Sequence, residues 1–131
     1  MKKKNGSMIS DSWITASSEY SDTVHQEHGA PHNARLDHQA GDVNIGAWAA
    51  SQSDTAPWIQ IRFSFLMSVA GIVLQGRQDL DQWVTKYEVQ YSSNDGVTWE
   101  HVKDDNRTTG RVSPEEEYQG RGTYDAITGP F

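Results

Sequence analysis

The sequence predicts an all-β domain, built as an antiparallel sandwich or barrel, and three observations lead to this prediction. Apolar and polar residues alternate in several short segments, which is typical of strands that bury one face. Long polar connections separate these segments, as in domains whose strands pack into layers. No segment carries a capped apolar stripe at the helical period, so helices are expected to contribute little.

Three segments in the middle of the chain are predicted as strands. Residues 58–63 alternate, with Ile59, Ile61 and Phe63 on one face and the polar Gln60 and Arg62 on the other. Residues 69–75 form a short and nearly continuous apolar run, which is typical of a strand buried on both faces. Residues 84–92 alternate again, with aromatic and β-branched residues on one side.

A hairpin is predicted directly after the third of these strands. Asn94, Asp95 and Gly96 separate residues 84–92 from a further alternating run at residues 97–102. An Asp-Gly pair between two such runs indicates a tight β-turn, because glycine accepts the positive φ angle that the turn requires. The two runs are therefore expected to pair as antiparallel neighbours.

The composition limits the classes of function. The 131 residues fit one domain, and five Trp and five Tyr supply large buried side chains although only 35% of residues are hydrophobic. The net charge of −7 argues against a nucleic-acid binder and against electrostatic attachment to anionic lipid, since both need clustered basic residues. The absence of cysteine excludes disulfides and thiolate metal sites. No apolar run is long enough for a transmembrane segment.

Catalysis and metal binding find little support in the motifs. The sequence lacks a nucleophile elbow, a phosphate-binding loop and a zinc-protease motif, and Asp79 and Asp81 are interpreted as solvated carboxylates. Zinc at a histidine-rich loop is the weaker interpretation, because Gly29 and Pro31 interrupt any helix that would align the ligands. This loop contains His25, Glu27, His28 and His32. No cofactor is expected, and calcium at Asp42, Asp79 and Asp81 is the alternative, because loop carboxylates supply hard oxygen ligands.

Single apolar residues stand inside three otherwise polar loops. Val24 lies in the first loop, Val43 and Ile45 lie in the second, and Leu80 lies in the third. One interpretation is that each side chain folds back onto the sandwich. The set as a whole favours another interpretation, in which the three loops share one rim and offer apolar tips to a partner.

The segment from Leu74 to Tyr87, with the sequence LQGRQDLDQWVTKY, resembles a signature of discoidin domains, also called coagulation factor V/VIII type C domains. Further stretches that resemble this family follow in the right order along the chain. They are residues 9–18, 33–36, 46–48, 58–61 and 91–99. The resemblance covers residues 8 to about 125.

The resemblance implies a jelly-roll β-sandwich of about eight strands with three loops, called spikes, at one end. The spikes correspond to residues 21–28, 37–45 and 78–81. Members of this family are mostly extracellular modules for adhesion and recognition, which bind glycans, anionic phospholipid or proteins such as collagen. Positions that the resemblance implies to be chiefly structural are Arg35, Trp48, Trp58, Trp83 and Trp99.

The sequence departs from the family pattern at its ends. The disulfide that usually joins the two ends is absent, and the chain stops at Phe131 before anything like the closing strands. We therefore expect residues 8–131 to be a single, C-terminally incomplete domain, and residues 1–7 to be a flexible tail or a remnant of cloning. The first strand, around residues 13–17, would be an unpaired edge. Residues 112–131 would be mobile, or the chain would self-associate through that edge.

These observations predict a non-enzymatic, extracellular or cell-surface adhesion module that binds cell-surface glycans or protein ligands through loops at one end of the sandwich. The alternative is a peripheral membrane module that binds phosphatidylserine through apolar loop tips. Acidic residues on the same rim favour the first hypothesis, because an anionic membrane repels them. The predicted ligand-binding residues are Val24, His25, His28, Asp42, Val43, Asn44, Ile45, Trp48, Arg77, Asp79, Leu80 and Asp81.

Overall fold

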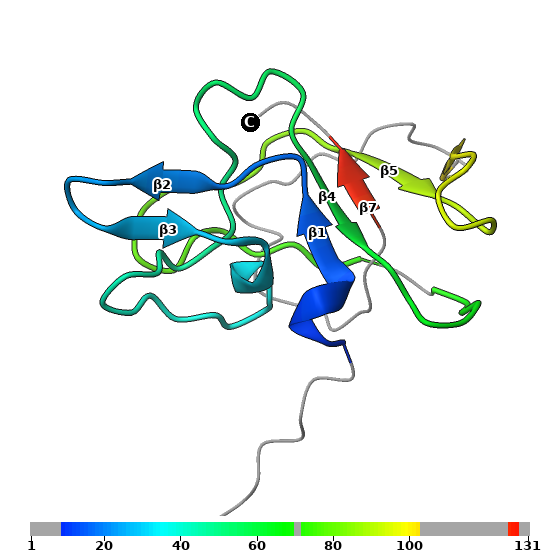
Figure 1. Ribbon diagram of the computed structural model, residues 1–131, viewed down its shortest axis with the longest axis horizontal. Coiled ribbons are helices and arrows are strands. Elements are labelled where there is room, and N and C mark those ends of the chain that lie inside the picture. The colour runs from blue at the N-terminus through cyan, green and yellow to red at the C-terminus, as the bar shows by residue number, and fades with distance from the viewer. Residues whose placement is uncertain (1–8, 70–71, 103–125, 129–131) are drawn as a thin grey trace, which may run out of the picture.

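The computed structural model describes residues 9–69, 72–102 and 126–128, and these residues form two antiparallel sheets without an α-helix (Figure 1). The strands are β1 (Ile14–Ala16), β2 (Tyr20–Asp22), β3 (Glu27–Gly29), β4 (Trp58–Ile61), β5 (Glu88–Tyr91), β6 (Glu100–His101) and β7 (Ala126–Thr128). Two short 3₁₀ helices, η1 (Asp11–Trp13) and η2 (Pro31–Asn33), precede β1 and follow β3. The all-β prediction is confirmed.

The larger sheet has five strands in the order β1-β4-β7-β5-β6. In β4, Ile61 lies opposite Ile14 of β1, and Ile59 lies opposite Ile127 of β7. The pairing of β1 with β4 extends beyond both strands, because the N–H of Arg62 donates to the carbonyl of Trp13 at 2.8 Å. Among the described residues, β1 therefore forms one edge of the sheet and β6 the other.

The apolar interior lies against β1 and β4. Ile14 is 7% exposed and Ile59 is 9% exposed, whereas the neighbouring Trp58 points outward and is 36% exposed. This alternation is the one that the sequence of residues 58–63 predicts. A mainly apolar cavity of about 130 Å³ remains beside Ile14 and Ile59, and Val73 also lines it.

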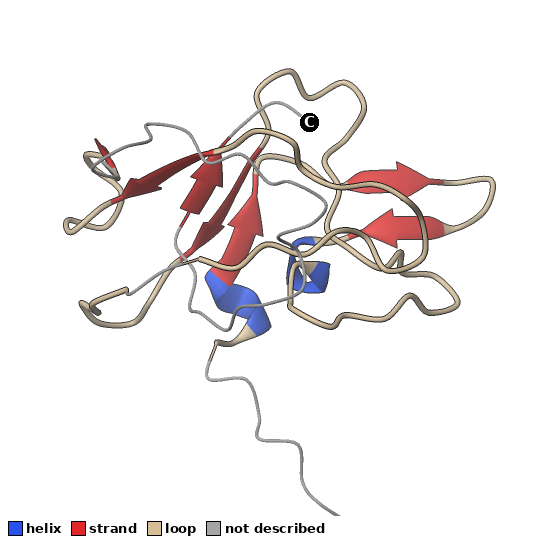
Figure 2. Cartoon of the chain, turned by 180° about the vertical axis from the view of Figure 1, so that it is seen from behind, coloured by secondary structure: helices blue, strands red, loops and turns tan. Residues whose placement is uncertain are grey.

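The smaller sheet is the β2–β3 hairpin, which projects from the body of the domain at the end opposite β5 and β6 (Figures 1 and 2). Its base is fixed because the N–H of Tyr20 donates to the carbonyl of Ala49 at 2.7 Å. Gly29 allows this close approach, since a Cβ atom there would lie 2.9 Å from the backbone nitrogen of Ala49. The hairpin is thereby attached to the segment that follows Trp48.

The predicted strands differ from the observed ones in extent. The strand predicted at residues 84–92 is shortened to β5, and residues 72–75 of the apolar run at 69–75 are not in a strand. The hairpin between β5 and β6 is confirmed, and Gly96 has the expected positive φ angle of 78°, while Asp95 also has a positive φ angle of 58°. The prediction of a tight turn is wrong, because β5 ends at Tyr91 and β6 begins only at Glu100.

Side-chain hydrogen bonds explain this wider turn. The hydroxyl of Ser92 accepts from the N–H of Gly96 at 2.9 Å, and the side-chain oxygen of Asn94 accepts from the N–H of Thr98 at 3.0 Å. These bonds satisfy backbone donors that a longer strand ladder would otherwise use.

The C-terminal part of the chain contributes a strand to the larger sheet. β7 lies between β4 and β5, so three residues of the segment expected to be mobile, 126–128, belong to the sheet. That expectation is wrong for these three residues. The rest of the segment 112–131 and the predicted tail at 1–7 lie outside the described residues. Self-association through β1 stays a prediction.

Candidate functional site

Three loops gather at one end of the domain, beside and behind the tip of the β2–β3 hairpin (Figure 1). We call this region the loop end and define it as residues 21–28, 37–45 and 78–81. The first two loops are joined through the backbone of His28. Its N–H donates to the carbonyl of Val43 at 2.8 Å, and its carbonyl accepts from the N–H of Ile45 at 3.0 Å.

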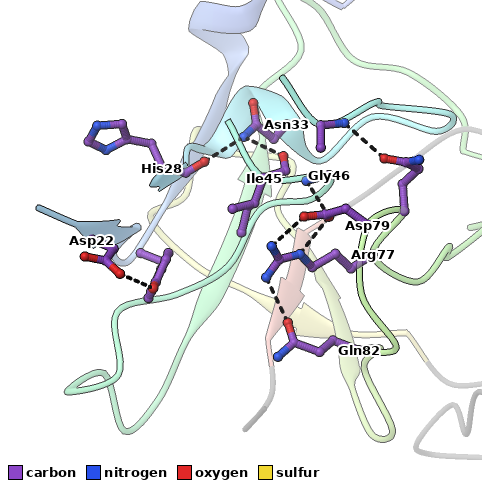
Figure 3. A network of polar contacts seen from close by, with 11 residues as sticks. Asp22, His28, Asn33, Ile45, Gly46, Arg77, Asp79 and Gln82 are labelled. Carbon is purple, nitrogen blue, oxygen red and sulfur yellow. Dashed lines mark hydrogen bonds and ion pairs between the residues drawn. The ribbon is translucent and has the colours of Figure 1, made fainter. Parts of the chain in front are cut away.

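The third loop is joined to the second by a clasp, which we define as Gly46, Arg77 and Asp79 (Figure 3). Asp79 Oδ1 accepts a hydrogen bond from the N–H of Gly46 at 2.8 Å and another from Arg77 Nε at 2.7 Å. Asp79 Oδ2 accepts from Arg77 Nη2 at 2.6 Å, so the ion pair is bidentate. The remaining guanidinium nitrogen, Nη1, donates to Gln82 at 3.1 Å.

The electrostatics of the clasp follow from this geometry. The hydrogen bonds from Arg77 lower the pKa of Asp79 from 3.8 to about 2, and Asp79 in turn raises the pKa of Arg77. The Arg77 side chain is only 11% exposed. Both charges are therefore engaged with each other rather than presented to a ligand.

Two further contacts tie the second loop to the third loop and to the segment before it. The N–H of Asp37 donates to the side-chain oxygen of Gln75 at 2.7 Å, and the N–H of Ala40 donates to that of Gln78 at 3.2 Å. Each contact joins residues 38 positions apart in sequence. The loop end is consequently one connected unit rather than three independent loops.

Asn33 is a supporting residue that sequence reasoning missed. It is 1% exposed, and its Nδ2 donates to the carbonyls of His28 at 3.2 Å and Ile45 at 3.3 Å (Figure 3). The Asn33 side chain thus links the first two loops by bonding to one carbonyl in each of them. Its signal in the sequence is its place in residues 33–36, one of the stretches that resemble the discoidin family.

Asp22 shapes the tip of the hairpin. Its Oδ1 accepts from the N–H groups of Val24 at 2.8 Å and His25 at 3.2 Å, and its Oδ2 lies 2.7 Å from Nδ1 of His25. The contact with His25 and these two N–H groups lower the pKa of Asp22 to about 2, while Asp22 raises the pKa of His25. The tip is therefore held in a turn that displays Val24, which is 81% exposed.

The predicted apolar tips fall into two groups. Val24, Leu80 and Val43 are exposed, at 81%, 52% and 45%, as a set of loop tips should be. The expectation that Ile45 is an exposed tip is wrong, because this residue is 2% exposed and belongs to the core. Its N–H pairs with His28, which turns its side chain inward toward Gly29.

The predicted polar residues also differ in their surroundings. Asp42 and Asp81 are exposed, while His28 and Asn44 are half-buried where the first two loops meet. Trp48 is half-buried, and its Nε1 donates to the carbonyl of Ser18 at 3.0 Å, which fits the structural role that the resemblance implies. His25 is held by Asp22, and Arg77 and Asp79 hold each other.

A groove of about 820 Å³ runs beside the third loop. Residues between 47 and 57 form one wall, and residues between 75 and 85 form the other. Trp48 and Trp83 both line it, together with Asp81 and the clasp residue Arg77. Sequence reasoning missed this groove, because the segment after Trp48 carries no motif and Trp83 resembles a structural position.

The parts of the chain that the structure describes contain no group of three or more His, Cys, Asp or Glu side chains placed to hold a metal ion. The zinc and calcium alternatives thus have no supporting geometry there. The same residues include no helix that is long and apolar enough to cross a membrane.

Residues 13–124 match the F5/8 type C domain, which covers most of the chain. The chain belongs to the F5/8 type C, or discoidin, family. This family has a β-sandwich fold and consists of binding modules rather than enzymes. The resemblance that the sequence motifs indicated is therefore confirmed.

Several proteins are similar to this discoidin domain. Retinoschisin from Takifugu rubripes is 35% identical over 96 residues, which are 73% of this chain and 33% of that protein. Lactadherin from Rattus norvegicus is 38% identical over 105 residues, which are 79% of this chain and 24% of that protein. EGF-like repeat and discoidin I-like domain-containing protein 3 from Homo sapiens is 37% identical over 100 residues, which are 75% of this chain and 20% of that protein. The chain thus spans at most a third of the length of these relatives.

Proposed function

We infer that this discoidin domain is an extracellular recognition module that binds a cell-surface glycan or a protein ligand through the loop end, without catalysing a reaction. The observation that carries this proposal is the clasp of Gly46, Arg77 and Asp79, which fixes the third loop against the second. Fixed loops bind well, because little conformational entropy is lost when a ligand docks on them.

The exposed charge at the loop end supports a neutral or cationic ligand. Asp42 and Asp81 are exposed, whereas Arg77, the basic residue that lines the adjoining groove, is paired with Asp79. An anionic ligand would meet uncompensated carboxylates and would gain little from this guanidinium.

A glycan array and a panel of immobilised extracellular-matrix proteins test the proposal. The Gly46→Ala variant serves as the loop-end perturbation, and Gly41→Ala is its matched control, since an added Cβ meets nothing within 4 Å there. We expect binding to at least one glycan or protein, and a larger loss of affinity in Gly46→Ala than in Gly41→Ala, which leaves the clasp intact. Blank arrays for the folded wild-type domain would refute the proposal.

Attachment to phosphatidylserine is the second candidate, and the exposed tips Val24, Val43 and Leu80 favour it. Each apolar side chain that becomes fully buried in lipid contributes about 1.5–3 kcal/mol. Acidic residues beside these tips oppose it, because an anionic surface repels them. Sedimentation with phosphatidylserine vesicles discriminates between the candidates. Strong binding that Val24→Ser and Leu80→Ser abolish would place this candidate first.

A further inference from the structure

We propose that the groove beside the third loop receives a lysine or arginine side chain of a protein ligand, held between the indole ring of Trp83 and the carboxylate of Asp81. This inference rests on the proposed function and specifies the chemistry of the partner. It concerns the groove between residues 47–57 and 75–85, and not the three apolar tips.

The dimensions of the groove suit a peptide segment. Its volume of about 820 Å³ lies within the range of roughly 300–1,000 Å³ that is usual for ligand sites. Trp83 is 45% exposed, so a large aromatic surface on one wall is open to a ligand. Tryptophan is the side chain that attracts cations most strongly through its ring face.

The charged side chains that line the groove differ in whether they are free to pair with a ligand. The carboxylate of Asp54 already accepts hydrogen bonds from Ser17 and Ser18 at 2.6 Å each, and Arg77 is engaged by Asp79. Within the described part of the chain, no hydrogen bond or ion pair engages the exposed carboxylate of Asp81. The groove therefore presents one available negative charge next to an aromatic wall.

This combination favours a basic peptide over a sugar. A glycan site commonly uses a guanidinium group to donate to hydroxyl oxygens, but three of the five N–H donors of Arg77 already bond to Asp79 and Gln82, and its side chain is only 11% exposed. A lysine or arginine needs an acceptor and a ring face instead, and Asp81 and Trp83 provide both from positions two apart on the same wall.

The probe is a displayed library of random nonapeptides, selected on the wild-type domain. We expect the enriched peptides to carry lysine or arginine at a shared position. Fluorescence anisotropy then measures the affinity of the best peptide for each variant. Asp81→Asn should weaken binding by about tenfold or more, whereas Glu19→Gln, which removes an equal exposed charge outside both the groove and the loop end, should change it less than about twofold.

Two further measurements separate this inference from a general electrostatic effect. Replacing the basic residue of the peptide by acetyl-lysine should abolish binding, and Trp83→Phe should weaken binding. Asp81→Asn should leave the midpoint of thermal unfolding of the domain unchanged. Peptides without an excess of basic residues, or equal losses in Asp81→Asn and Glu19→Gln, would overturn the inference. Binding of a glycan or another protein in the arrays would then leave the proposed function standing.

Discussion

The carboxylate of Asp79 accepts the backbone N–H of Gly46 at 2.8 Å, and these two residues lie 33 positions apart in the sequence. This single contact makes the second and third loops of the discoidin domain one unit. Nε and Nη2 of Arg77 also donate to this carboxylate, which fixes it in the position from which it accepts the N–H of Gly46.

Replacing Gly46 by alanine is expected to open the clasp. The added Cβ would lie 2.6 Å from Asp79 Oδ1 and 2.9 Å from the Cβ of Gln78, which is closer than atoms tolerate. We expect a loss of about 1–3 kcal/mol in the free energy of unfolding, measured by urea denaturation. Gly41→Ala, where the new Cβ meets nothing within 4 Å, should change it by less than about 0.5 kcal/mol. Equal changes in the free energy of unfolding for Gly46→Ala and Gly41→Ala would contradict a stabilising role of the clasp.

The Asp79→Asn variant should lower stability at neutral pH and flatten the acid limb of the stability curve. The pKa of Asp79 is about 2 in the folded protein against an ordinary value of 3.8, so its contribution is present above about pH 4 and is lost as the pH falls toward 2. We expect a loss of about 1–2 kcal/mol at pH 7 that shrinks at low pH. Denaturation between pH 2 and 7 measures it, with Asp81→Asn as control. A pH-independent loss would show that the charge of Asp79 does not matter.

The imidazole of His25 should titrate at a higher pH than a free histidine. Its Nδ1 lies 2.7 Å from Asp22 Oδ2, and that contact raises its pKa. An NMR titration of the histidine ring protons should show this increase, and Asp22→Asn should remove it. The pairing then stabilises the tip at pH values below the pKa of His25 and weakens as the pH rises through it. An unchanged midpoint in Asp22→Asn would refute the contact.

Filling the interior cavity should stabilise the fold. Val73 lines this space of about 130 Å³, and Val73→Ile would add one methylene group to it. We expect a gain of about 0.5–1 kcal/mol in the free energy of unfolding, measured by chemical denaturation. Val24→Ile adds the same group at an 81% exposed tip and should have no measurable effect. Destabilisation by Val73→Ile would mean that the cavity is too narrow for the added group.

Local sequence patterns predicted those features that depend on neighbouring residues. The alternation around Ile59 predicted its burial, because the faces of a strand repeat every second residue. Gly96 predicted a positive φ angle in the β5–β6 hairpin, because glycine accepts that conformation. The motif from Leu74 to Tyr87 predicted the family, which the match to residues 13–124 confirmed.

Local sequence patterns could not predict features that depend on contacts between residues far apart in the sequence. Ile45 has the same polar neighbours as an exposed tip, and only its pairing with His28 turns it into the core. Asp79 suggests a ligand contact, yet its bond to the N–H of Gly46, 33 positions away, gives it a structural role. The position of β7 between β4 and β5 likewise arises from pairing across a large part of the chain.

The placement of β7 also determines when the larger sheet can assemble during synthesis. β4 and β5 do not pair with each other. Each of them pairs with β7, residues 126–128, which lies between them. Residues 126–128 must therefore leave the ribosome before the β1–β4 pair and the β5–β6 pair can join into one sheet, and until then the edges of β4 and β5 that face β7 are unpaired. Nascent chains of this domain are expected to depend on chaperones until β7 has emerged, because β7 is the last of the described strands in chain order and joins the two pairs.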